Sequence, residues 1–208
     1  MPAILPARLK VKVNQLVKKI GEPEDFIKSL RNMLDYYSDR VRRPGRAPSQ
    51  TSLMRSYQVP KQVTRQIETR LKKIIPEDQE NALTLADNLW QEDWLECRIL
   101  ALQILGWVPP NPPQKILDRL NLWCEQRGED HVLDGMFAVG LSGLWKETPD
   151  IFFDLIESWL RSSKIKNQKL GLRVIPFLVR DKDFQNLPKI ISLLTPFVEQ
   201  VDSVPNPD

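Results

Sequence analysis

The sequence is short of the residues that build metal sites and disulfide frameworks. It contains one histidine and two cysteines, Cys97 and Cys124, which do not form a CxxC pair. A structural zinc site takes about four Cys or His ligands, so a metal centre of that kind is nearly excluded. The sequence also lacks a GxxxxGK[ST] phosphate loop, an HExxH pair and a nucleophile elbow. We predict neither a metal nor a cofactor.

Long hydrophobic runs are missing as well. No apolar stretch approaches the roughly 20 residues that a membrane-spanning helix needs. The N-terminal stretch MPAILPARLKVKVNQLVKKIG has no apolar core of the signal-peptide type and no small-residue cleavage site. Thiols without a pairing pattern fit a reducing compartment. The sequence therefore predicts a soluble, cytoplasmic protein with no membrane partner.

Glycine is scarce and proline is abundant, with 8 and 17 residues respectively. This balance favours helices punctuated by prolines over strands joined by glycine turns. Helical periodicity dominates from residue 60 onward. The expected helices span about 24–38, 58–74, 77–91, 94–108, 114–127, 131–146, 150–162 and 165–180, and a last one begins near residue 184. The sequence predicts an all-α protein.

Apolar stripes mark the faces that these helices should bury. The predicted buried positions are Val63, Ile67, Leu71 and Ile74 in the first stripe, Leu83, Ala86, Leu89 and Trp90 in the second, and Leu95, Ile99 and Leu102 with Leu105 or Ile104 in the third. The helices at 77–91 and 94–108 are separated by a short QED stretch, which leaves room only for a tight turn. These two helices should therefore form a pair.

Prolines and tryptophans recur at a nearly constant interval. Successive helix pairs open at Pro76, Pro112 and Pro149, and their first helices end near Trp90, Trp123 and Trp159. A helix–turn–helix unit of about 35 residues is typical of α-solenoids. The tetratricopeptide pattern is absent, so we predict an α-α superhelix of the HEAT-like or ARM type. The tryptophans should lie in the core between repeats, and the second helix of each pair should line the concave face.

The repeat pattern predicts one HEAT-like repeat domain over residues 1–208. Residues 1–22 form an N-terminal extension, and residues 23–75 form basic opening helices and a loop. Helix-pair repeats follow over 76–202, and 203–208 form a tail.

The net charge of +3 hides a strong segregation. Residues 40–73 contain ten basic residues and one acidic residue, residues 74–160 contain five and sixteen, and residues 161–189 contain eight and two. The two basic zones are either solvated helix faces or contacts for a polyanion. The candidate contacts are Arg42, Arg43 and Arg46 in a Pro/Gly loop, Lys61 and Arg65 on the next helix, and Lys166, Lys169 and Arg173 on one stripe at i, i+3 and i+7.

A carboxylate interrupts the apolar stretch GEDHVLDGMFAVGLSGLWKETPD at 128–150. Asp134 lies three residues after His131, the only histidine of the chain. Two interpretations remain open for Asp134. It is either a capping or solvated residue early in a helix, or a carboxylate at the floor of a binding cleft. His131 is likewise either a surface residue or a proton partner of Asp134.

Four stretches of the chain are informative in their order and spacing. They are YQVPKQVTRQI (57–67), ADNLWQEDWLECRILALQIL (86–105), VLDGMFAVGLSGLWKETPD (132–150) and ESWLRSSKIKNQKLGLRVIPFL (157–178). Together they resemble the HEAT-like DNA alkylation-repair glycosylases of the AlkD type, over roughly residues 25–200. The resemblance implies a curved helical array that holds double-stranded DNA in a basic concave cleft.

The activity implied by the resemblance is hydrolysis of the N-glycosidic bond of N3- or N7-alkylpurines. Asp134 occupies the place of the Asp that supports this cleavage in the family. Such a carboxylate would stabilise the positive charge that develops on the deoxyribose and orient a water molecule.

The chain departs from the family pattern at three positions. Asp130 stands where the family has a tryptophan that packs against the sugar–phosphate backbone, Lys166 replaces an aromatic residue and Lys169 replaces an arginine. A second carboxylate near Asp134 would repel phosphate unless it is paired. One function is therefore DNA binding, with glycosylase activity or as a diverged non-catalytic binder. The alternative is a HEAT-repeat scaffold with a protein partner on its concave face.

Overall fold

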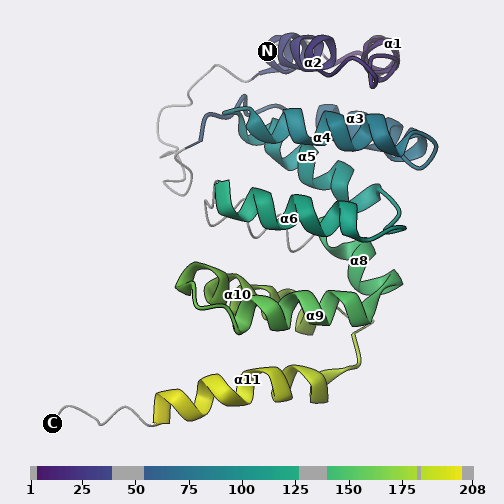
Figure 1. The fold of residues 1–208 in the computed structure, drawn as a ribbon. Coiled ribbons are helices and arrows are strands. Elements are labelled where there is room, and N and C mark those ends of the chain that lie inside the picture. Colours follow the sequence, from purple (N-terminus) through teal and green to yellow (C-terminus); the bar gives the residue numbers. More distant parts are fainter. Residues whose placement is uncertain (1–3, 39–53, 127–139, 182–183, 203–208) are drawn as a thin grey trace, which may run out of the picture. The chain divides into compact units, whose positions relative to one another are not determined.

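The computed structural model describes residues 4–38, 54–126, 140–181 and 184–202, and within these ranges it contains helices and no strand. The helices are α1 (Pro6–Val17), α2 (Pro23–Tyr37), α3 (Lys61–Ile74), α4 (Gln79–Gln91), α5 (Leu95–Trp107), α6 (Gln114–Gln126), α8 (Ser142–Glu147), α9 (Pro149–Leu160), α10 (Ile165–Arg180) and α11 (Leu187–Asp202). Figure 1 shows them in chain order. The predicted all-α class is confirmed, and the contacts between paired helices are consistent with a solenoid.

Most of the predicted helices begin and end within three residues of the observed ones. Prolines explain several of the starts, because Pro6, Pro23 and Pro149 each occupy the first helical position, where the missing N–H costs nothing. The helix α1 was not predicted. The predicted helix at 131–146 lies largely outside the described residues, and α8 covers only its C-terminal part.

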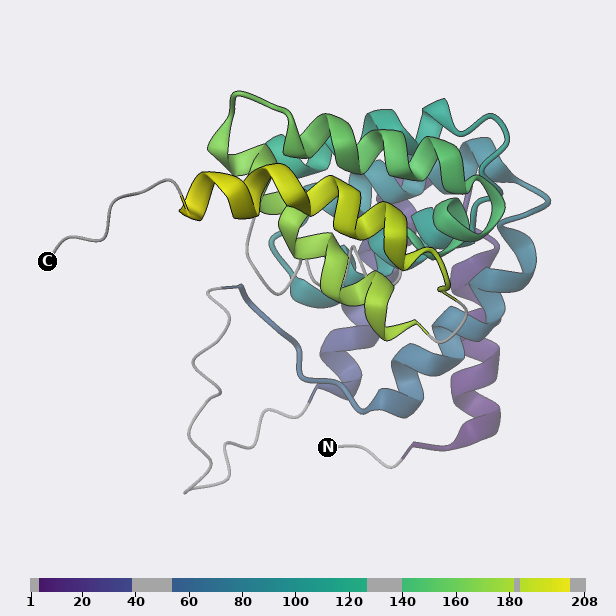
Figure 2. The same cartoon turned by 90° about the horizontal axis from the view of Figure 1, so that it is seen from below.

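The chain divides into two compact units, residues 1–148 and residues 149–208. In the first unit, α4 packs antiparallel against α5, which confirms the predicted pair. Helices α2, α4 and α6 contact one another in succession, and so do α3, α5 and α8. Helix α1 packs against both α2 and α3 (Figures 1 and 2). The first unit thus contains two rows of helices, the arrangement that a repeat of helix pairs requires.

The predicted apolar stripe of α4 is fully buried, and so is the stripe of α3 from Val63 to Leu71. Three predicted core positions are wrong. Ile74 and Leu95 are only half-buried, whereas Ile75 is buried, and the side chain of Ile99 is 40% exposed. Helix α5 packs against α3, α4 and α8, so its buried positions surround most of the helix and do not follow a single stripe. Ile99 lies on the remaining open side.

The contact between α4 and α6 combines stacked tryptophans with ion pairs. The rings of Trp90 and Trp123 are parallel within 8°, with their centroids 4.7 Å apart. Both side chains are buried, which confirms the prediction that these tryptophans form core between successive helix pairs. Trp159 of α9 is buried as well.

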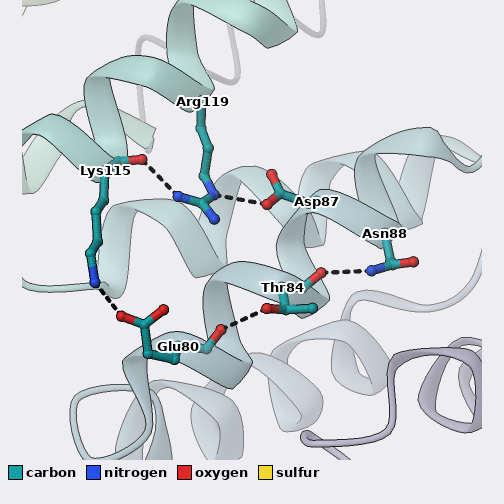
Figure 3. Close-up of polar contacts among 6 residues, drawn as sticks. All are labelled: Glu80, Thr84, Asp87, Asn88, Lys115 and Arg119. Atoms are coloured by element: carbon teal, nitrogen blue, oxygen red, sulfur yellow. Dashed lines mark hydrogen bonds and ion pairs between the residues drawn. The ribbon is translucent and has the colours of Figure 1, made fainter.

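Beside the tryptophans, α6 holds α4 through two cations (Figure 3). Arg119 Nε donates to Asp87 Oδ2 at 2.9 Å, and Lys115 pairs with Glu80. Burial raises the pKa of Asp87, and the Arg119 guanidinium acts in the opposite direction. The two pairs fix the register of α6 along α4, because they join two different turns of α6 to two different turns of α4.

Both cysteines are buried, and neither forms a disulfide. Burial raises the pKa of the Cys97 thiol to about 12. The thiol of Cys97 is therefore uncharged at neutral pH and has little nucleophilic character.

The second unit contains the predicted pair α9 and α10. Leu170, Val174 and Leu178 of α10 are buried, as are Phe152, Ile156 and Leu160 of α9. Gly171 allows the two helices to approach closely, because a Cβ atom built on it would stand 2.7 Å from side-chain atoms of Leu160. Figure 2 shows the same helices along a perpendicular view.

Candidate nucleic-acid interface

Helix α3 is amphipathic and basic. Val63, Ile67 and Leu71 face the core, whereas Lys61 and Arg65, both predicted polyanion contacts, are exposed one turn apart. Lys72 and Lys73 in the last turn are exposed too. The only acid on this helix is Glu68. The outward side of α3 is therefore strongly cationic.

The segment before α3 is fixed to the start of α5. The ring of Tyr57 stacks on Trp94 with centroids 3.8 Å apart, and the Leu95 amide donates to the Arg55 carbonyl at 2.9 Å. Glu96 Oε1 accepts hydrogen bonds from the Gln58 amide at 3.0 Å and from the Ser56 hydroxyl at 2.7 Å. These contacts fix where α3 begins and hence where its cations point.

Gln58 adopts a positive φ of 53°, a conformation that non-glycine residues rarely take. Its amide is held there by Glu96 and by the Ser56 hydroxyl. Burial raises the pKa of the neighbouring Tyr57, and the hydrogen bond between Tyr57 and Arg31 acts in the opposite direction. The strain at Gln58 is compensated by charge-assisted hydrogen bonding.

The second cationic face lies on α10. Lys166 and Lys169 are exposed and Arg173 is half-buried, on a helix that contains no acidic residue. Their spacing places all three on one side, next to the apolar side that packs on α9. The three predicted cations therefore lie along one side of α10, with Lys166 and Lys169 open to solvent.

The turn between α9 and α10 fixes the first residues of α10. The Ser162 hydroxyl accepts hydrogen bonds from the Lys164 amide and from Asn167 Nδ2, both at 3.2 Å. Gln168 Nε2 donates to the Ser162 carbonyl at 2.9 Å. Ser162 lies in the turn between α9 and α10, and its hydrogen bonds fix the start of α10. The positions of Lys166 and Lys169 on α10 follow from this start.

The other predicted site residues lie outside the described residues. They are Arg42, Arg43 and Arg46 in the loop and Asp130, His131 and Asp134 in the acidic stretch. Their roles remain predictions. Of the eight predicted cationic contacts, five are described, and the structure groups them as two on α3 and three on α10.

The described part of the chain contains no group of three His, Cys, Asp or Glu side chains that could hold a metal ion. None of its helices combines the length and the apolar character needed to cross a membrane.

Lys and Arg side chains clustered along one side of a helix are the charge pattern with which proteins contact a nucleic-acid backbone. The sequence matches the family described as DNA alkylation repair enzyme over residues 31–197. This match covers most of the chain, and the protein belongs to the DNA alkylation repair enzyme family. The resemblance stated from the four sequence stretches is thereby confirmed. Comparisons with curated proteins and with solved structures gave no match.

Proposed function

We propose that this protein binds double-stranded DNA and hydrolyses the N-glycosidic bond of N3- or N7-alkylpurines. The observation that carries the proposal is the family match over residues 31–197, which includes both cationic helices and the segment that contains Asp134. Two cationic faces on a scaffold of paired helices support the DNA-binding part. The catalytic part rests on the family and on the chemistry of a carboxylate at residue 134.

The reaction requires little from the protein at the leaving group. Alkylation at N3 or N7 makes the purine cationic, so the base leaves as a neutral molecule when it takes the electron pair of the C1′–N bond. Positive charge then develops on the deoxyribose, and water adds its oxygen to C1′ and releases a proton. A fixed carboxylate at Asp134 stabilises the developing charge and orients the water.

The cationic side chains position the duplex. Lys61, Arg65, Lys166, Lys169 and Arg173 contact phosphates, and each contact releases counterions from the DNA. Such contacts carry no sequence information, which suits an enzyme that must find lesions in any sequence.

The decisive experiment measures release of 7-methylguanine from methylated duplex DNA. We expect release by the wild-type protein. For Asp134→Asn we expect the rate to decrease by about 100-fold or more, because the variant removes the charge that stabilises the transition state. The matched control is Asp154→Asn, which removes an exposed carboxylate of α9 and should leave the rate unchanged.

Each outcome separates the hypotheses. Duplex binding without base release would contradict the catalytic part and leave a diverged DNA-binding protein. Absence of duplex binding at low salt would contradict the whole proposal and favour a scaffold for a protein partner.

A further inference from the structure

A hollow of about 600 Å³ lies between α1 and α2. Its polar lining consists of Lys12, Gln15, Lys18, Lys19, Ser29 and Asn32. Every one of these side chains has a hydrogen-bond donor, and no acidic residue is among those that line the hollow. This composition suits an anion.

The charge of the surrounding segment points the same way. Between residues 4 and 21 the chain contains five basic residues and no acidic one. The bases are Arg8, Lys10, Lys12, Lys18 and Lys19. Apolar residues of α1 such as Leu9 and Val13 are buried, so the helix is held in the fold and presents its lysines from a fixed position.

Two of the ammonium groups are held in place by contacts with α2. Lys12 Nζ lies 3.9 Å from the centroid of the Tyr36 ring, and Lys19 Nζ donates to the Ser29 hydroxyl at 3.0 Å. Neither contact neutralises the charge of the lysine. Since part of the side-chain entropy is already lost, a bound anion has less ordering to impose.

The spacing of the two fixed lysines suits a polyanion better than a single ion. Their partners Ser29 and Tyr36 lie seven positions apart within α2, which corresponds to about 10 Å along that helix. One strand of duplex DNA carries about three phosphates over that length of its axis. Lys18, which is exposed between them in sequence, adds a third charge to the same hollow.

A neighbouring hollow provides a contrast within the same unit. It lies between α2 and α4 and is lined by Lys28 and Arg31, but also by Glu24 and Glu92. Arg31 Nη1 lies 3.6 Å from Glu92 Oε2. The lining of that hollow thus includes carboxylates, whereas the described residues that line the hollow between α1 and α2 include none.

We infer that the hollow between α1 and α2 binds backbone phosphates of nucleic acid, through lysines that precede the residues matching the family. Helix α1 lies entirely before residue 31, where the family match begins. The inference rests on the proposed DNA binding and adds a third cationic contact to those on α3 and α10.

The test compares two double variants of equal charge in the full-length protein. Lys12→Gln/Lys19→Gln removes the fixed ammonium groups, and Arg8→Gln/Lys10→Gln removes two exposed cations of the same helix that do not line the hollow. Binding to a fluorescent duplex is measured by anisotropy at several salt concentrations. The slope of log K against log salt is negative. We expect its magnitude to decrease by about 2 for the first variant and to stay near the wild-type value for the second.

A third variant guards against a change in folding. Lys12→Arg/Lys19→Arg keeps both charges and should restore the wild-type slope. The inference is overturned if the variant at Lys12 and Lys19 binds like the one at Arg8 and Lys10, a result that leaves the proposed function intact. It is also overturned if polyglutamate binds the wild type but not the Lys12→Gln/Lys19→Gln variant while the duplex binds both alike, which would indicate an acidic protein partner. Failure of the wild type to bind any duplex would instead contradict the proposed function itself.

Discussion

At the scale of single residues, Arg98 is the buried charge that fixes the turn between α4 and α5. Its side chain is 3% exposed. Arg98 Nε donates to the Glu92 carbonyl at 2.9 Å, and Nη1 donates to Met54 Sδ at 3.3 Å. The guanidinium also lies 3.7 Å from a carboxylate oxygen of Asp93. The Arg98 side chain thus joins the turn between α4 and α5 to the segment that leads into α3.

We predict that Arg98→Ala lowers the free energy of unfolding by about 2 kcal/mol or more. The change removes packing and leaves the Glu92 carbonyl without its donor in a largely buried place. Urea unfolding followed by circular dichroism measures the loss. The matched control is Lys73→Ala on the exposed side of α3, which should change the stability by less than about 0.5 kcal/mol. Equal stability of the two variants would contradict the role given to Arg98.

At the scale of helices, α9 and α10 approach each other closely within the second unit. A Cβ atom at Gly171 would stand 2.7 Å from Leu160 side-chain atoms and 3.3 Å from its backbone nitrogen. Leu160 is itself buried, so its side chain has little room to move. The glycine is therefore required by the distance between the helices.

We predict that Gly171→Ala destabilises the protein although alanine is the better helix former. Overpacking a core contact costs about 1–3 kcal/mol, whereas the gain in helix propensity is about 1 kcal/mol. Thermal unfolding measures the net effect.

The control for this prediction is Gly143→Ala in α8. Among the described residues, a Cβ atom there would meet only the Gly106 carbonyl oxygen, at 3.4 Å, which is close to ordinary contact. The gain in propensity should make this variant at least as stable as the wild type. A Gly171 variant as stable as the Gly143 variant would show that the α9–α10 contact yields easily.

At the scale of the whole molecule, the cationic faces on α3 and α10 belong to different compact units. If both contact one duplex, removing both should reduce the salt dependence by the sum of the two separate effects. We predict that the variant Lys166→Ala/Lys169→Ala/Arg173→Ala decreases the magnitude of the slope of log K against log salt by about 3. The variant Lys61→Ala/Arg65→Ala should decrease it by about 2.

Anisotropy titrations of the two variants and of their combination provide the measurement. In the combined variant the magnitude of the slope should decrease by about 5, close to the loss of five phosphate contacts. If the combined variant shows no larger decrease than the α10 variant alone, only one of the two faces contacts DNA.

Most of the helices could be predicted from the sequence because their information is local. The periods of apolar residues around Leu83 and Val63 and the prolines at helix starts fix both the type and the limits of those elements. The recurring tryptophans predicted the contact between helix pairs, since a large aromatic at a fixed place in a repeat is buried by the next repeat. The cationic stripe of α10 was readable for the same reason, because spacing alone places residues on one side of a helix.

Helix α1 was missed although its signal was present. Leu9, Val13, Leu16 and Val17 follow a helical period and Pro6 marks the start. The lysines of the hollow were missed with it, because no anion-binding composition is visible until α2 supplies Ser29 and Asn32 from a different part of the chain.

The sequence by itself determined the helical class, the limits of most helices, the pairing at short turns and the family. Only the tertiary structure decided that Ile99 is exposed, that Arg98 is buried, that Gly171 meets Leu160 and that α1 and α2 enclose a cationic hollow. The physical reason is the range of the interactions. Periodicity and caps act within a few residues, whereas burial and pairing depend on side chains that the fold brings together from distant positions.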